Sequence, residues 1–380
     1  MTKLKICFIS TNPSFLGGTA MFLYNLLEYL KKTKNNLDEF TWIYKGKENK
    51  KYKKKGINFV EIKGTEFYPL GNFLFNFKIL KFLKKNYYDI INSHIVELWI
   101  NFYKKRDNQK IICTYHGTDY YFFKNHFKRF NLIKKIFFSP LLFISWLQER
   151  PPIKKVDKFI CVSQKAKRQV EKLYGKKENS FVIRTGVDLK NFKPRNKNKI
   201  KEKLNFDKKK IYGLYVGRGG YWTKGLDRVI KISERIYNLN KNYRLIVIGS
   251  NLKKVGPLLN KKFIIYIEQG KREMMPYYYN SANIFFCMSR YEGGAPTLVV
   301  SEAMASGCLV VCSKDSEQEI IEEGKNGLII ESFGKESAEK VLKILEDKKK
   351  KEKIIRNSME TIKEISLEKW GKKYSDVLFG

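Results

Sequence analysis

Residues 283–313 read NIFFCMSRYEGGAPTLVVSEAMASGCLVVCS and hold a strand, a loop, a helix and a second strand in that order. The two ends, NIFFCMS and CLVVCS, are short apolar runs, as expected for strands that are buried on both faces. Between them, Pro296 and Thr297 precede about ten residues of helical pattern, and Gly307 is a typical helix terminator. This order indicates a parallel sheet that helices cover on both sides.

The same alternation extends through almost the whole chain. In the helix predicted over 225–240, one face is shared by Leu226, Val229, Ile230, Ser233, Ile236 and Tyr237. The other strand-like runs are LKICFIS, FTWIYK, INFVEI, YDIINSH, KIICTYHG, KFICVS and SFVIRTG in the first half and IYGLYVGR, YRLIVIGS, FIIYIEQ and GLIIES in the second. We therefore predict an α/β fold of two Rossmann-like, doubly wound parallel-sheet domains that face a central cleft at the carboxyl ends of their strands.

A basic segment interrupts the alternation. Residues 189–208 are polar, strongly basic and contain Pro194, so we predict a linker there. It would separate an N-terminal domain, residues 1–190, from a C-terminal domain, residues 191–365. After Ile330 the pattern is helical to the end.

The charge balance favours an anionic partner. The sequence has 76 lysines and arginines against 38 acidic residues, a formal charge of +38. Such an excess suits a membrane surface, a nucleic acid or a phosphorylated ligand, and the alternative is a solvated lysine-rich surface. Because the sequence has no RNP, zinc-finger or helix-turn-helix signature, we do not expect it to bind nucleic acid.

Cysteine and histidine usage points to a reducing compartment without a zinc site. The six cysteines lie in or beside apolar runs, and there are three histidines and no Cys-x-x-Cys. The apolar part of MTKLKICFIS is too short for a signal peptide, so we predict a first strand there and a cytoplasmic protein.

Two glycine-containing loops are candidates for binding phosphate. Gly17 and Gly18 precede a helix that begins near Thr19, so their amides can face an anion, although an ordinary strand-to-helix turn explains them equally well. In GRGGYWTKGLD, Arg218 and Lys224 flank a helix start and suit a diphosphate, although alone they are also explained as solvated charges. This loop lacks the Lys-Ser/Thr pair of a P-loop, which disfavours an ATPase.

Two further side chains point to a ligand. Glu302 lies one turn inside an otherwise apolar helix, where a buried carboxylate needs donors such as vicinal sugar hydroxyls; the alternative is a glutamate that reaches solvent. Thr297 is the expected N-cap of that helix. His116 follows the strand KIICTY at a carboxyl edge, where ligand residues lie, whereas a lone histidine is more often structural. Asp119 fits a cap of the next segment.

These segments together resemble the retaining nucleotide-sugar glycosyltransferases of family 4, also called glycosyl transferases group 1, which have the two-domain GT-B fold. The resemblance covers nearly the whole chain, and the number and order of its parts make it specific. Its parts are the Gly17-Gly18 loop, DIINSH (89–94), YHGTD (115–119), FICVS (159–163), TGVDLKNFKP (185–194), VGR, TKGLD, the block from YEGG to EAMASG, EIIEEGKNGLII (319–330) and SLEKWGKKYSDVLF near the end.

The resemblance implies a hexosyltransferase that uses a nucleotide-diphosphate sugar and a glycan or lipid-linked acceptor. Arg218 and Lys224 would hold the diphosphate, and Glu302 would bind the ribose hydroxyls. Glu292 and the amides after it would address the donor sugar, beside His116. The positions assigned to the donor are Gly17, Gly18, His116, Arg218, Lys224, Glu292, Gly293, Gly294, Thr297 and Glu302. The last helix, 366–380, would return to the N-terminal domain.

One spacing departs from the family. Nine residues separate Glu292 from Glu302 where the family has seven, and seven would select Gly294, which has no side chain. We interpret the difference as a two-residue loop insertion that leaves Glu292 in the sugar-facing role. No Asp-x-Asp motif is present, so we expect no metal ion and no other cofactor.

Residues 120–150 suggest a membrane contact. They hold ten aromatic and six basic residues against one acidic residue. A helix over 124–137 would place Phe127, Phe130, Ile133 and Phe137 on one side and Lys124, Lys128 and Lys135 largely on the other. This profile is typical of a helix in an anionic membrane interface, here the inner face of the cell membrane, and the alternative is a core-facing helix with its lysines in water. The run IFFSPLLFISWL is too short to span.

Two other functions stay open at this point. One is a nucleotide-sugar epimerase or a phosphorylase on the same fold; an epimerase would release a changed nucleotide sugar or free sugar without needing an acceptor. A non-catalytic membrane or nucleic-acid adaptor would use only the charge, and it would tolerate the loss of Glu302 and Arg218.

Overall fold

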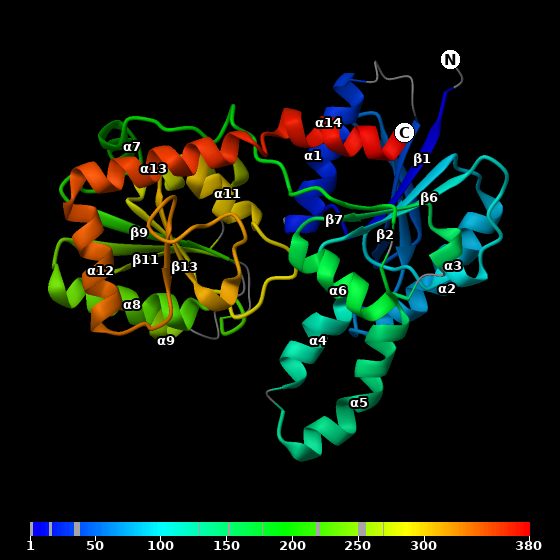
Figure 1. Cartoon of the computed structure of the whole chain (residues 1–380), viewed down its shortest axis with the longest axis horizontal. Coiled ribbons are helices and arrows are strands. Elements are labelled where there is room, and N and C mark those ends of the chain that lie inside the picture. Colours follow the sequence, from blue (N-terminus) through cyan, green and yellow to red (C-terminus); the bar gives the residue numbers. More distant parts are fainter. Residues whose placement is uncertain are drawn as a thin grey trace. The chain divides into compact units, whose positions relative to one another are not determined.

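The chain forms two compact α/β units. The computed structural model describes residues 3–14, 17–33, 39–128, 130–150, 153–176, 178–217, 221–249, 256–268 and 270–380 (Figure 1). Unit 1 comprises Met1–Arg184 and Trp370–Gly380, and unit 2 comprises Thr185–Lys369. The boundary therefore lies between Arg184 and Thr185, six residues before the predicted one.

Unit 1 is built on a sheet that is parallel except at one edge. Within the described residues its strand order is β3-β4-β2-β1-β5-β6-β7-β8, and only β3 runs antiparallel to its neighbour. The bounds are β1 Lys5–Ser10, β2 Glu39–Gly46, β3 Lys50–Lys54, β4 Ile57–Lys63, β5 Ile90–Ser93, β6 Lys110–Tyr115, β7 Lys158–Cys161 and β8 Ser180–Val182. The chain builds outward from β1 in both directions, so the strand order reverses between β1 and β5.

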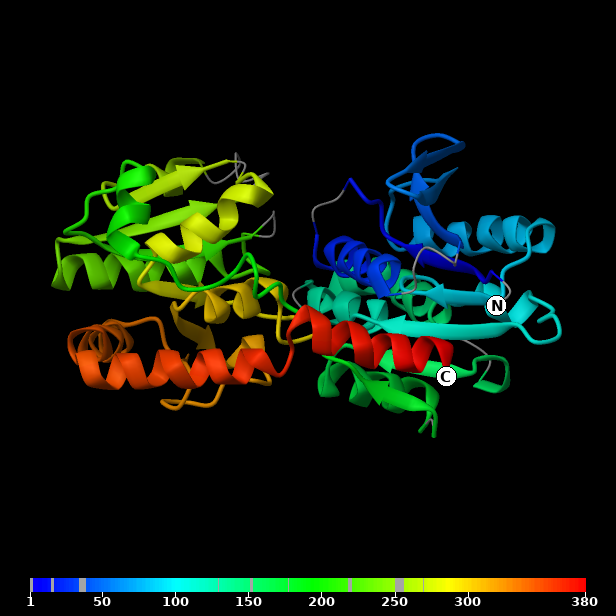
Figure 2. The same ribbon diagram turned by 90° about the horizontal axis from the view of Figure 1, so that it is seen from above.

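Helices cover both faces of this sheet. The helices of unit 1 are α1 Gly18–Thr33, α2 Leu70–Lys85, α3 Trp99–Phe102, α4 Asp119–Phe127, α5 Leu132–Leu147, α6 Gln164–Tyr174 and α14 Leu367–Phe379, with the 3-10 turn η1 at Ile153–Lys155. On one face α2, α3 and α6 share a core with Ile9. On the other face α14 packs beside α1, where Trp370 meets Phe22 edge-on and a Cβ at Gly371 would clash with Tyr29 (Figure 1, Figure 2).

Unit 2 is a second parallel sheet. Among the described residues the order is β11-β10-β9-β12-β13-β14, and the reversal lies between β9 and β12. The strands are β9 Ile211–Val216, β10 Tyr243–Ile248, β11 Ile264–Ile267, β12 Ile284–Cys287, β13 Leu309–Ser313 and β14 Leu328–Ile330. The helices are α7 Lys197–Lys203, α8 Leu226–Leu239, α9 Gly256–Leu259, α10 Met275–Ser281, α11 Leu298–Ala305, α12 Lys335–Glu346 and α13 Lys348–Lys363. One core lies under α8 and α12 and the other under α10 and α11.

The predicted α/β class is confirmed, and every strand-like run became a strand. Five of the six residues on the predicted face of α8 are buried, Tyr237 is half-buried, and Ile232 is buried in addition. The strand that the sequence did not predict is β3, with the sequence KKYKK. Such a segment has no apolar period of its own, and it is ordered by pairing with β4 at the edge, where lysines are common.

The predicted linker over 189–208 was wrong. This segment belongs to unit 2, in which α7 forms and Phe192 and Ile200 are buried. The Lys201 ammonium is also buried and donates to the carbonyls of Lys208 and Lys210, at 3.2 and 2.7 Å. Lysines are long enough to pack their stems and satisfy backbone acceptors, so a basic composition did not imply an extended connection.

The single helix predicted over 124–137 was also wrong. It is divided into α4 and α5, because the Asn131 side chain accepts from the Lys134 amide at 3.0 Å and caps α5. The core-facing alternative does not hold either, since Ile133 and Phe137 are 78% and 75% exposed. No helix in the described part of the chain is long and apolar enough to cross a membrane.

Candidate active site

The first group of predicted residues lies where the strand order of unit 2 reverses, at the carboxyl ends of β9 and β12. Parallel sheets of this kind bind ligands at such points. Gly225, the N-cap of α8, has φ +71°, and a Cβ there would lie 1.9 Å from the carbonyl oxygen of Met288. Glycine is therefore required where the loop after β9 touches the loop after β12.

Lys224 and Glu292, predicted from these two loops, form an ion pair. Lys224 Nζ lies 2.7 Å from Glu292 Oε2, and the glutamate side chain is 8% exposed. Burial lowers the pKa of Lys224, but the charge of Glu292 and its hydrogen bond outweigh burial, and the net pKa is raised. The ammonium is thus firmly charged, and the lysine side chain that carries it is 42% exposed.

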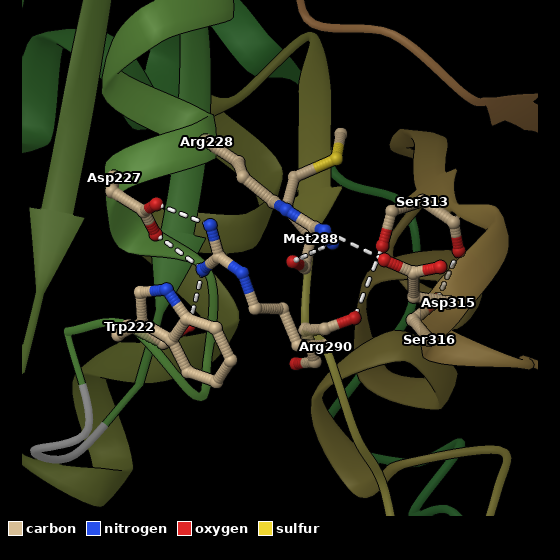
Figure 3. Close-up of polar contacts among 9 residues, drawn as sticks. Trp222, Asp227, Arg228, Met288, Arg290, Ser313, Asp315 and Ser316 are labelled. Atoms are coloured by element: carbon tan, nitrogen blue, oxygen red, sulfur yellow. Dashed lines mark hydrogen bonds and ion pairs between the residues drawn. The ribbon is translucent and has the colours of Figure 1, made fainter. Parts of the chain in front are cut away.

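A second ion pair braces the same two loops. The Arg290 guanidinium makes two hydrogen bonds to the Asp227 carboxylate, at 2.8 and 2.5 Å, and it lies 4.2 Å from the Trp222 ring centroid (Figure 3). Arg290 also donates to the Trp222 carbonyl, and its amide donates to that of Thr223. A planar guanidinium suits this combination of bidentate pairing and stacking. This brace was not predicted from the sequence.

Further along α8, Arg228 makes a similar connection. It donates to the carbonyl oxygen of Met288 at 3.4 Å and to Asp315 at 2.6 Å (Figure 3). The end of β12 is therefore tied to α8 and to the segment after β13. These two arginines hold the loop that carries Glu292 in a fixed position relative to Lys224.

Glu302 is buried on α11, at 1% exposure, which rules out the solvent-reaching alternative. Tyr279 donates to Oε2 at 3.0 Å, and Arg272 Nη1 lies 2.5 Å from Oε1. Burial raises the pKa of Glu302, an effect that Arg272 and Tyr279 partly offset. Oε1 receives no well-aligned hydrogen bond from any described residue, so the arginine contact is an ion pair that leaves acceptor capacity on Oε1.

Thr297 is at the N-cap position of α11, but its side chain does not cap the helix. Its amide donates to Gln318 Oε1 at 3.0 Å, and its hydroxyl lies 3.5 Å from the same oxygen. The predicted N-cap position is therefore confirmed, but the Thr297 hydroxyl is directed at Gln318 and not at the first amides of α11. Gly293 and Gly294 are half-buried in the loop between Glu292 and this position.

In unit 1, Gly17 and Gly18 stand at the start of α1, close to the predicted start at Thr19. Nothing lies within 4 Å of a Cβ built at either position, and the first turn of α1 holds no acidic residue. The first amides of this helix are thus not covered by an acidic neighbour from their own turn, which is compatible with an anion. The glycines alone do not distinguish this from a turn.

His116 lies after β6, as predicted, and it is not alone. Its Nε2 is 3.1 Å from Nδ1 of His94, which follows β5. Phe22 of α1 meets the His116 ring edge-on, with centroids 4.7 Å apart. Thr118 caps α4 by accepting from the Tyr121 amide at 3.3 Å, so Asp119 is the first helical residue rather than the cap.

Arg218 lies outside the described residues. No described group of three or more histidine, cysteine, aspartate or glutamate side chains could hold a metal ion. Arg272 and Arg290 were missed because each meets its partner across more than 25 residues, and only the bare arginine in a polar segment signals it in the sequence.

Two family models match this chain, one on each half. The model described as Glycosyltransferase Family 4 matches residues 16–191, and the model described as Glycosyl transferases group 1 matches residues 196–361. Spore coat protein SA of Bacillus subtilis (strain 168) is 29% identical over 195 residues, which are 45% of this chain and 51% of that protein. The match thus spans about half of that relative.

Solved structures show the same fold. Sucrose-phosphate synthase from Thermosynechococcus elongatus superposes with a TM-score of 0.80 at 17% identity, over 99% of this chain and 98% of that one. WaaG, a glycosyltransferase involved in lipopolysaccharide biosynthesis, gives 0.78 at 16%, over 99% and 100%. HepE from Anabaena in complex with UDP and glucose gives 0.68 at 15%, over 99% of both. With its two matching models, its two parallel-sheet units and these neighbours, the chain belongs to the group 1, family 4 glycosyltransferases of the GT-B fold.

Proposed function

We propose that the protein is a retaining glycosyltransferase that moves a sugar from a nucleotide-diphosphate sugar to a hydroxyl of an acceptor. The observation that carries the proposal is Glu302. Its carboxylate is buried among apolar residues, and Oε1 keeps acceptor capacity beside the partly exposed Arg272. Vicinal hydroxyls of a ribose are donors of the right kind for such an acceptor. The Anabaena neighbour, which is in complex with UDP and glucose, supports a nucleotide of this class.

The chemistry requires that negative charge on the departing diphosphate be stabilised. Lys224, charged and partly exposed beside Glu292, is one cation for this role, and Arg218 is the second by resemblance. Fixed cations and helix amides stabilise such charge without a metal ion, and we propose a metal-independent reaction. In a retaining transfer the acceptor attacks from the face that the diphosphate leaves, and a phosphate oxygen takes the acceptor proton. Neither His116 nor Glu292 is then required as a base.

We further propose that the acceptor is a glycolipid or a growing cell-surface glycan at the inner face of the membrane. The apolar side chains on the exposed face of α5 are Leu132, Ile133, Ile136, Phe137 and Phe143, which are 58–78% exposed. They share one face of the helix, and α4 and α5 form a hairpin that extends away from the sheet of unit 1 (Figure 1). Lys128 and Lys134 are exposed near them. Aliphatic and aromatic residues flanked by lysines suit an anionic lipid surface.

A donor screen tests the proposed activity. UDP, GDP and ADP sugars are incubated with the protein and a membrane-lipid extract, and the released nucleoside diphosphate and the product are measured. We expect release with one nucleotide series, dependence on the extract, and an anomeric configuration that matches the donor. A changed nucleotide sugar or free sugar without an acceptor would favour the epimerase instead. Inertness toward every donor, with and without extract, would refute the transferase.

A further inference from the structure

Two of the three histidines of unit 1 form a hydrogen-bonded pair. His94 and His116 follow the neighbouring strands β5 and β6, with His94 Nδ1 3.1 Å from His116 Nε2. The rings are close to parallel, with centroids 5.4 Å apart. The His94 amide also donates to the carbonyl of Ile9 at 2.8 Å, and His94 is 4% exposed. Backbone and burial therefore fix the His94 ring, and His94 in turn meets the half-buried ring of His116.

Both rings are neutral at physiological pH. Burial lowers the pKa of His116 to about 4. Burial, and secondly the neighbouring His116, hold the pKa of His94 well below its ordinary value. A neutral imidazole carries one N–H and one lone pair. The pair thus has two protons for four ring nitrogens, and the shared hydrogen bond uses one proton and one lone pair.

Two tautomeric arrangements satisfy that bond, and they differ at His94 Nε2. This atom is buried and has no partner among the described residues. If His116 donates, His94 Nε2 carries a hydrogen and becomes a buried N–H without an acceptor. If His94 donates through Nδ1, its Nε2 holds only a lone pair. An orphaned N–H is rarer in protein interiors than an acceptor that lacks a donor, so the second arrangement is favoured.

The surroundings are consistent with this assignment. The rings next to His94 are those of Phe8 and Phe22, with centroids at 6.2 and 5.7 Å. Neither side chain offers a hydrogen-bond acceptor of ordinary strength to His94 Nε2. When His94 donates, His116 Nε2 accepts, and the hydrogen of His116 must sit on Nδ1. That atom makes no hydrogen bond within the described ranges of the chain.

We propose that His94 is a positioning residue that fixes His116 as the Nδ1–H tautomer and makes it a hydrogen-bond donor to an oxygen of the transferred sugar. The inference rests on the proposed function for the identity of the ligand, but the tautomer itself does not. A donating His116 holds a sugar oxygen in place, and it cannot accept a proton from the acceptor through Nδ1. It therefore agrees with a reaction in which a phosphate oxygen, not a histidine, takes that proton.

The tautomer can be measured directly, because the sequence has only three histidines. In protein labelled with 15N-histidine, the ring nitrogen shifts and their couplings to carbon-bound protons report which nitrogen carries hydrogen. We use His126→Asn, on α4, and His94→Asn to assign the signals. The expected result at pH 7 is that His116 is protonated on Nδ1 and His94 also on Nδ1. Protonation of His116 on Nε2 would overturn the proposal.

Two substitutions of His94 test its consequence. Asparagine places an amide N–H near the position of Nδ1, and we expect His94→Asn to keep the tautomer and most of the turnover. Leucine offers no hydrogen-bond donor, so we expect both His116 tautomers to be populated in His94→Leu. We expect kcat to fall about 10- to 100-fold with little change in the KM of the sugar donor, as when other groups that orient a ligand-binding side chain are removed. Equal kcat in His94→Leu and wild type would contradict the positioning role. Absent wild-type turnover refutes only the proposed function, since the NMR measurement needs none.

Discussion

At the scale of single residues, the ion pair between Lys224 and Glu292 has a direct consequence for ligand binding. In the unliganded protein the ammonium already has a counter-ion at 2.7 Å. A diphosphate that binds Lys224 must compete with, or share, this contact. The brace of Arg290 on Asp227 keeps the two loops together whether or not the pair persists. The cation is thus held ready at low entropic cost, which is how preorganised charges stabilise a leaving group.

We predict that Lys224→Ala lowers sugar transfer about 10²- to 10³-fold, because one fixed donor to the developing charge is lost. It also leaves the buried Glu292 carboxylate without its counter-ion, so the variant should be less stable as well. Turnover and thermal unfolding are measured in parallel. Lys231→Ala, which removes an exposed lysine of α8, is the control and should match wild type. Wild-type transfer by a folded Lys224→Ala protein would remove Lys224 from the reaction.

Asp119 gives rise to a second prediction, about the pH dependence of stability. Its carboxylate accepts from Gln148 at 2.6 Å and Asn72 at 3.4 Å, and burial raises its pKa to about 6. The folded state then holds this proton more tightly than the unfolded chain, whose ordinary value is near 4. The contribution of Asp119 to stability is present below about pH 4 and is lost as pH rises to about 6.

Asp119→Asn removes this titration and keeps an acceptor oxygen. Relative to wild type, we expect the variant to gain about 2 kcal/mol between pH 4 and 6.5, measured by urea denaturation at both values. His94 and His116 titrate with the opposite sign, but they are present in both proteins. The Asp119 charge also raises the pKa of the buried Glu97 and Glu149, and its removal changes stability in the same direction. Asp376→Asn, on the exposed side of α14, should show no such change. A difference that is the same at both pH values would show that Asp119 ionises normally.

Single residues also show which parts of the site the local sequence pattern predicts and which it does not. The burial of Glu302 could be predicted, because a charged residue in LVVSEAMA has no solvent face to occupy. Its partner Arg272 could not, since it lies in a polar segment 30 positions earlier and only the folded chain brings them together. The same holds for Asp227 and Arg290. Motifs therefore located Lys224, Glu292 and Glu302, whereas the contacts of the two arginines depend on the tertiary fold.

At the scale of elements, the apolar period predicted strands well and helix limits poorly. The buried strands can be recognised from their apolar composition, whereas β3 is ordered by its pairing with β4. The division between α4 and α5 depends on one capping asparagine, Asn131, which the amphipathic pattern over 124–137 concealed. The apolar period is present there, but its residues lie on a hairpin of two helices, and this hairpin exposes the apolar face to solvent. Periodicity reports which residues share a face, not what that face contacts.

The exposed apolar face of α5 predicts that the protein binds lipid surfaces. We expect the protein to sediment with vesicles that contain anionic phospholipid at low salt and to bind neutral vesicles less. The double variant Ile133→Ser, Phe137→Ser should weaken this binding about 10- to 100-fold, because two exposed apolar side chains no longer enter the interface. Its thermal unfolding should be unchanged. Leu239→Ser, an exposed leucine of α8, is the matched control.

If the wild-type protein ignores anionic vesicles, or if the double variant binds them as well as the control does, α5 is not a lipid-binding element. Concentration-dependent self-association that the double variant abolishes would assign the same face to a second copy of the chain.

At the scale of the whole molecule, few of the basic residues behind the charge of +38 have a proposed ligand or lipid partner. Lys224 and the lysines of the hairpin have proposed partners, while Lys201 and Lys155 serve the fold by donating to backbone carbonyls. The C-terminal helix α14 also packs on α1, the first helix of the chain. Trp370 and Tyr374 of α14 pack on Phe22 of α1, the side chain that meets His116. The C-terminal helix thus supports the core behind a proposed sugar-binding residue.

The central claim is that unit 2 binds the nucleotide of a sugar donor through Glu302, and calorimetric titration with UDP, GDP and ADP tests it most directly. We predict that one nucleotide binds wild type, and that Glu302→Gln weakens it about 10- to 100-fold, because charge-assisted bonds to the ribose become neutral ones. Glu336→Gln, an exposed glutamate of α12, should bind as wild type does. Equal affinity in wild type and a folded Glu302→Gln, or no binding of any nucleotide, would contradict the claim.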